Sequence, residues 1–124
     1  MNETIQLEEI DGIGVFRPVG ACSAKQAAHL FTLAIERARE RSLGRLLVVI
    51  TGLSGFAPPT LSERHLMVRA WANAAQGRVR VAMVTTPDFI DPEKFGVVAA
   101  ANFGLTANVF SNEAAASAWL KSLD

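Results

Sequence analysis

The stretch Leu46-Leu47-Val48-Val49-Ile50 is an uninterrupted run of aliphatic residues, and its last three are β-branched. A strand that is covered by helices on both faces has this pattern, whereas a strand with one face in water alternates apolar and polar residues. We therefore expect this run to form a central strand of a parallel sheet.

Two more strands are expected on the N-terminal side of this run. Polar residues alternate with Ile5 and Leu7 over residues 4–8, which predicts a half-buried strand that ends near a turn at Asp11-Gly12. A second strand is expected from Ile13 to Val19. Together these strands would form an antiparallel hairpin.

Capping residues predict four helices. They are expected to begin at Ser23, at Thr60 or Ser62, at Asp91-Pro92, and at Ser111 or Asn112, and the first three are expected to end at Gly44, Gly77 and Gly104. The buried stripe of the second helix is expected to hold Leu66, Met67, Ala70, Trp71 and Ala74. Strands are expected over residues 78–85 and 107–110. This order predicts an α/β fold, with a mostly parallel five-stranded sheet, an N-terminal antiparallel hairpin and four helices.

The composition excludes several classes of protein. A length of 124 residues fits a single domain spanning residues 1–124. Twelve basic residues balance twelve acidic ones, so no net charge attracts nucleic acid, which is not an expected partner. Cys22 is the only cysteine, and the N-terminal residues lack the basic segment of a signal peptide. We expect a cytoplasmic protein.

Catalytic and metal-binding residues do not gather in the sequence. His29 and His65 lie in predicted helices without a second ligand four residues on, so no metal site is expected. Ser54 follows a strand as the serine of a nucleophile elbow does, but Phe56 replaces the closing glycine of that motif. The sequence therefore predicts a protein without enzymatic activity, metal or cofactor.

The loop over residues 52–61 is the main candidate for a functional surface. It follows the carboxyl end of the central strand, where open α/β sheets bind their ligands. Its apolar residues, together with a tryptophan in the next helix, are Leu53, Phe56, Pro58, Pro59, Leu61 and Trp71. Such a loop forms a ligand lid, a membrane contact or a protein interface, or else it folds over the end of the sheet as part of the core.

The chain resembles the SpoIIAA-like branch of the STAS superfamily. The resemblance rests on the strand at 46–50 that runs into Thr51-Gly52-Leu53, on the strand at 78–84, and on the ending at 107–120, where a strand closing in Phe110 precedes an alanine-rich helix closing in Trp119-Leu120. It implies a SpoIIAA-like fold and relatives that are similar to anti-sigma-factor antagonists and, more loosely, to CRAL-TRIO lipid-binding domains.

The resemblance also bears on Ser54. Antagonists carry a phosphorylatable serine in an Asp-Ser-x-Gly turn, and Ser54 is the nearest candidate, although Leu53 stands in place of the Asp and Phe56 in place of the Gly. We expect a non-enzymatic regulatory or binding domain that holds an apolar or amphipathic ligand, or touches a membrane surface, under the 52–61 loop. The alternative is a protein-interaction module, either a homodimer or an antagonist-like regulator, with no small ligand.

Overall fold

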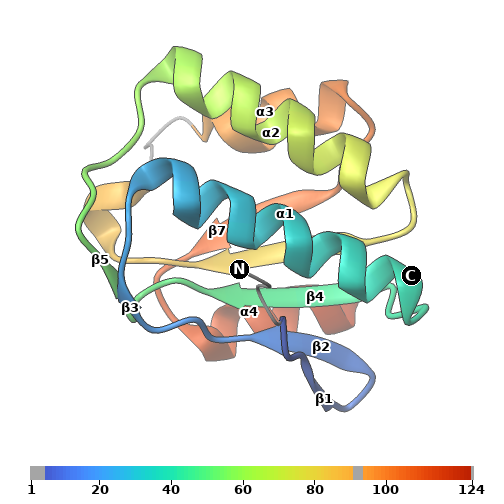
Figure 1. Ribbon diagram of the computed structural model, residues 1–124. Helices are drawn as coiled ribbons and strands as arrows, with labels where there is room; N and C mark the ends of the chain where they lie inside the picture. The colour runs from blue at the N-terminus through green and yellow to red at the C-terminus, as the bar shows by residue number, and fades with distance from the viewer. Residues whose placement is uncertain (1–4, 91–93, 124) are drawn as a thin grey trace.

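The computed structural model describes residues 5–90 and 94–123, and it contains a five-stranded sheet with helices on both faces (Figure 1). In chain order the elements are β1 (Glu8–Ile10), β2 (Ile13–Phe16), β3 (Gly20–Ala21), α1 (Ala24–Glu40), β4 (Arg45–Val49), β5 (Leu53–Ser54), α2 (Leu61–Ala75), β6 (Arg80–Val84), the 3-10 turn η1 (Pro87–Phe89), α3 (Phe95–Asn102), β7 (Ala107–Phe110) and α4 (Glu113–Ser122). The main sheet has the order β1-β2-β4-β6-β7, and only β1 is antiparallel to its neighbour. The predicted α/β class is confirmed.

The central position of β4 explains its unbroken aliphatic sequence. Leu46 and Val48 pack in the cluster that includes α1 and α2, whereas Leu47 and Val49 pack in the cluster that includes α4. Figure 1 shows the same arrangement, with α1, α2 and α3 on one side of the sheet and α4 on the other. Both faces of β4 are therefore covered, as its sequence predicts.

The N-terminal hairpin is confirmed and its second strand begins at Ile13 as predicted, but the first strand was predicted too early and the second too long. The first strand is Glu8–Ile10, and Ile5 lies before it as a buried core residue. The second strand ends at Phe16, and Val19 is 84% exposed. Pro18 has no N–H to donate to the ladder, so the strand ends before it.

Three of the predicted helix caps are confirmed in detail. Ser23 and Thr60 each form a complete capping box, and the side chain of Asn112 accepts a hydrogen bond from the N–H of Ala115. The predicted start of the third helix at residues 91–92 lies outside the described residues, and α3 begins at Phe95.

The predicted end of the first helix at Gly44 is wrong. Ser42 takes the left-handed conformation, with a φ of 57°, and the N–H of Leu43 reaches back to the carbonyl of Ala38 at 2.8 Å. This is a Schellman arrangement, in which an apolar residue follows the left-handed one and packs on the helix. Leu43 is buried in the core, and its burial fixes the end of the helix at Glu40, four residues before Gly44.

The predicted stripe of α2 is partly wrong. Leu66 is 66% exposed and Ala70 is exposed, whereas Val68, Ala72 and Ala75 are buried. Helix α2 packs against both α1 and α3, so its buried surface is turned by about one residue from the stripe that the sequence predicts.

The segment predicted as one loop over residues 52–61 is partly ordered into strand. Leu53 and Ser54 form β5, which pairs in parallel with β3, and the N–H of Cys22 donates to the carbonyl of Ser54 at 2.9 Å. Leu61 is already the first residue of α2. Within this segment, Gly52 forms a turn and irregular chain covers only residues 55–60.

Among the described residues, no helix is long and apolar enough to cross a bilayer.

Candidate functional site

An apolar cavity of about 130 Å³ lies on the three-helix side of the sheet, near the carboxyl ends of β4 and β6. Its walls come from α1, α2, α3, the inner faces of β6 and β7, and the chain segments that follow β5 and β6. Its wall runs along β6 and β7, and its end at Phe56 and Phe89 lies beyond the carboxyl ends of strands, where open α/β sheets bind ligands. This cavity is the candidate site.

Small side chains on α1 leave room for the cavity. Ala24, Ala27 and Ala28 all line it, so the first two turns of this helix present methyl groups where larger side chains would fill the space. Beyond them Phe31 stacks on Trp71, with ring centroids 4.2 Å apart and planes 23° apart. The indole Nε1 of Trp71 donates to the carbonyl of Ala28 at 3.3 Å, so the polar edge of the ring is satisfied within the wall.

The mouth of the cavity is formed by the chain segments that follow β5 and β6. Phe56 and Pro59 come from the segment after β5, and Phe89 comes from η1 after β6. The rings of Phe56 and Phe89 meet edge to face, with centroids 5.6 Å apart. The 3-10 turn was not predicted from the sequence, and it supplies the partner of Phe56.

The structure brings together some of the residues singled out in the sequence and separates others. Phe56, Pro59 and Trp71 line the cavity. Leu53 is half-buried in β5, and Pro58 and Leu61 are exposed outside the cavity. Ser54 is exposed in β5 and points its backbone carbonyl at Cys22.

Two cationic side chains that sequence analysis missed also line the cavity. Arg64 donates from Nε to the carbonyl of Pro59 and from Nη2 to the carbonyl of Phe89, each at 3.3 Å. Lys94 donates from Nζ to Oδ1 of Asn108 at 2.9 Å. The spacing of Arg64 from Met67, Val68 and Trp71 places them on one helix face, and that spacing was the signal available in the sequence.

Other chemically active side chains remain apart from the cavity. The ring of His65 lies against Phe103, with centroids 5.3 Å apart, and Cys22 is a free, half-buried thiol. No group of three or more His, Cys, Asp or Glu side chains that could hold a metal ion occurs among the described residues. The cavity is therefore distinguished by its apolar wall and its two cations.

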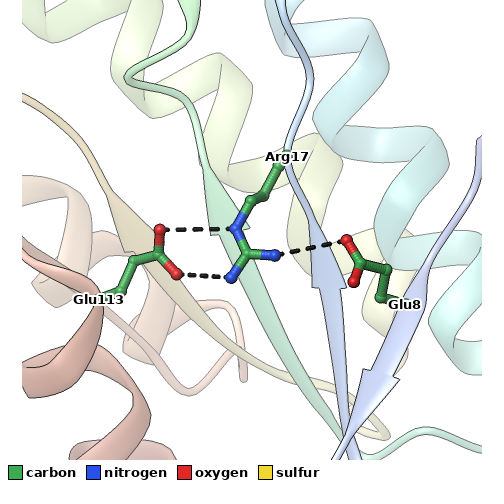
Figure 2. A network of polar contacts seen from close by, with 3 residues as sticks. All are labelled: Glu8, Arg17 and Glu113. Carbon is green, nitrogen blue, oxygen red and sulfur yellow. Dashed lines mark hydrogen bonds and ion pairs between the residues drawn. The ribbon is translucent and has the colours of Figure 1, made fainter.

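An ion-pair cluster lies at the opposite face of the sheet (Figure 2). Arg17, just after β2, donates from Nη2 and Nε to the two carboxylate oxygens of Glu113 at 2.7 and 3.5 Å, and from Nη1 to Glu8 at 3.4 Å. The hydrogen bond to Glu113, assisted by the charges of both carboxylates, raises the pKa of the Arg17 guanidinium. This cluster ties α4 to β1 and β2, and its one guanidinium is paired with two carboxylates.

Comparison with known proteins identifies the fold. No family model matches the sequence, and no curated protein matches it. The solved structure of the anti-sigma factor antagonist SpoIIAA in its unphosphorylated form matches with a TM-score of 0.52 and 17% sequence identity, covering 97% of this chain and 100% of that one. This likeness confirms the fold that the sequence resemblance implied. The chain therefore has a SpoIIAA-like fold.

Proposed function

We propose that this protein is a non-enzymatic binding domain that takes an apolar or amphipathic small molecule into the cavity beneath Phe56 and Pro59. The observation that carries the proposal is the apolar wall of a cavity with room in it. Phe31, Val81 and Leu105 line this wall, and their exposed fractions are 5%, 2% and 2%. Water in such a place finds few hydrogen-bond partners, whereas an apolar group that replaces it gains burial.

The mouth of the cavity supports the same function. The chain is anchored through the pairing of β3 with β5 up to Ser54, and α2 is capped from Thr60, so only residues 55–59 lie outside regular structure between these two points, held by the Arg64 bond to Pro59 and the contact of Phe56 with Phe89. A change in the position of that segment would open the cavity without breaking the sheet or a helix. The lid suggested by the sequence is therefore shorter than residues 52–61.

Binding of the neutral dye Nile red tests the proposal. We expect its emission to rise and shift to the blue with the native protein, and we expect Ala28→Phe to abolish this response because the new ring fills the cavity. Ala118→Phe is the matched control, since Ala118 is exposed on α4 across the sheet. Ala24→Leu is a smaller filling substitution if Ala28→Phe does not fold. Equal dye binding by the native protein, the folded cavity variants and the control would refute the proposal.

A protein-interaction module is the second candidate function. It is supported by the SpoIIAA-like fold, since the solved protein of that fold is named an anti-sigma factor antagonist. It is also supported by Leu61 and Leu66 of α2, which are 61% and 66% exposed. If these side chains join two copies of the chain, Leu66→Glu will convert a dimer to a monomer in light scattering. If the native protein is a monomer at all concentrations, the homodimer hypothesis is refuted.

A further inference from the structure

We propose that the ligand of the cavity is an amphiphile with an anionic head group, which Arg64 and Lys94 hold while the apolar chain lies along the inner wall. This inference rests on the function proposed above and specifies the chemical class of the ligand. Two observations support it: the charged side chains that line the cavity are cations, and their described partners are uncharged.

Both charged side chains that line the cavity are cations, and no carboxylate among the described residues lines it. The two described hydrogen bonds of Arg64 go to neutral backbone carbonyls, although its guanidinium has five N–H donors. No carboxylate of the described residues forms a salt bridge with it. Within the described residues, the remaining donors of Arg64 have no acidic partner, and they can bind an anion.

Lys94 is partnered in the same way. Its ammonium group donates to the amide oxygen of Asn108, and it lies 5.6 Å from the centroid of the Phe110 ring. An amide and an aromatic ring stabilise a cation without neutralising it. Arg17 in the same protein shows the contrasting case, because that guanidinium is paired with two carboxylates.

The lining residues are more deeply buried at the inner end of the cavity than at its mouth. Val81, Ala100 and Leu105 at its inner side are at most 2% exposed, whereas Arg64 and Lys94 are half-buried. The bonds of Arg64 to Pro59 and Phe89 hold its guanidinium at the mouth. An amphiphile would follow this order, with its chain inside and its head group accepting charge-assisted hydrogen bonds at the mouth.

Three probes that share a twelve-carbon chain test the inference: dodecanoate, dodecyl phosphate and dodecanol, each kept monomeric and titrated by calorimetry. We expect at least one of the two anions to bind about tenfold more tightly than dodecanol, which is the order of effect of one charge-assisted hydrogen bond. The tighter anion then distinguishes a carboxylate from a phosphate head group. If dodecanol binds as tightly as both anions, this inference is wrong and the proposed function stands; if none of the three binds, both fail.

Charge variants locate the head group. Arg64→Gln and Lys94→Gln should each reduce the preference for the anion over dodecanol to less than threefold, and Arg64→Lys should restore part of that preference. Arg69→Gln and Lys25→Gln are matched controls, because these exposed residues lie on α2 and α1 outside the cavity lining. A full anion preference in both folded Gln variants would overturn the assignment.

Discussion

The indole of Trp71 lies nearly parallel to the ring of Phe31 and 4.2 Å from it, so the contact between α1 and α2 is also a wall of the cavity. Trp71→Ala removes both the stacking and the hydrogen bond to Ala28. We expect it to lower the free energy of unfolding by about 3 kcal/mol. This value is at the lower end of the range for removal of a large aromatic side chain, because Trp71 is only partly buried. Trp71→Phe keeps a ring and loses the hydrogen bond, at a cost of about 1 kcal/mol. Urea unfolding measures both values. If Trp71→Ala and Trp71→Phe lower the free energy of unfolding equally, the stacking of the two rings contributes little.

Gly55 is held against the backbone of Cys22, which fixes the start of the segment that carries Phe56. Its φ is +99°, and a Cβ there would lie 2.8 Å from the carbonyl oxygen of Cys22. We expect Gly55→Ala to destabilise the fold by about 3 kcal/mol or more, because strained φ and steric overlap add. Gly12→Ala is the control, since Gly12 has a φ of +79° with nothing within 4 Å, and it should cost only about 1–2 kcal/mol. If both variants lower the melting temperature equally, the backbone at the β3–β5 contact moves apart at little energetic cost.

Glu63 links the stability of α2 to pH. Its carboxylate accepts the backbone N–H of Thr60 at 2.8 Å, and this bond, together with that to the Thr60 side chain, lowers the pKa of Glu63 below its ordinary value of 4.5. A carboxylate whose pKa is lower in the folded state stabilises that state above the unfolded pKa, and this stabilisation is lost as the pH falls through the folded pKa.

The prediction for Glu63 is therefore a difference in pH dependence. We expect the stability advantage of the native protein over Glu63→Gln to be present at pH 7 and to shrink as the pH falls below about 4.5. Urea midpoints of both proteins across that range measure it. Glu9→Gln in β1 is the control, because Glu9 is exposed and remote from a helix start. A constant difference between native protein and Glu63→Gln at all pH values would contradict the assignment.

The elements that the sequence predicted well are those whose signals are local. The aliphatic run of β4 and the capping boxes at Ser23 and Thr60 each need only a few neighbouring residues, and all three are found in the structure. The likeness of the whole chain to a solved SpoIIAA structure confirms the architecture that these local signals predict.

The features that were missed depend on contacts between distant residues. The two-residue strands β3 and β5 carry no periodicity of their own and exist because Gly20 and Leu53 pair. The exposure of Leu66 depends on how α2 is turned between two other helices. Arg64 and Lys94 became site residues only when the fold placed α2 and the start of α3 beside one cavity.

Ser54 is exposed in β5, so a kinase could reach its hydroxyl, but the residues around it differ from an Asp-Ser-x-Gly turn. We predict that Ser54→Ala leaves the fold and any cellular phenotype unchanged, because its described contact with Cys22 is made by the backbone carbonyl. Mass spectrometry of protein purified from its own cells provides the check. Phosphate on Ser54, together with loss of binding to a protein partner, would reverse this prediction and favour the antagonist-like function.

Phe56 is the residue whose replacement best separates a ligand site from a protein interface. Phe56→Asp places a carboxylate at the mouth of the cavity, against the ring of Phe89, so it should abolish the rise in melting temperature and the change in Trp71 emission that a bound detergent or fatty acid causes. Val19→Asp is the matched control, because Val19 is 84% exposed and lies outside the cavity lining. Circular dichroism should show both variants folded. If neither response occurs in the native protein and Phe56→Asp instead turns a dimer into a monomer in light scattering, the ligand site is refuted and the interaction module takes its place.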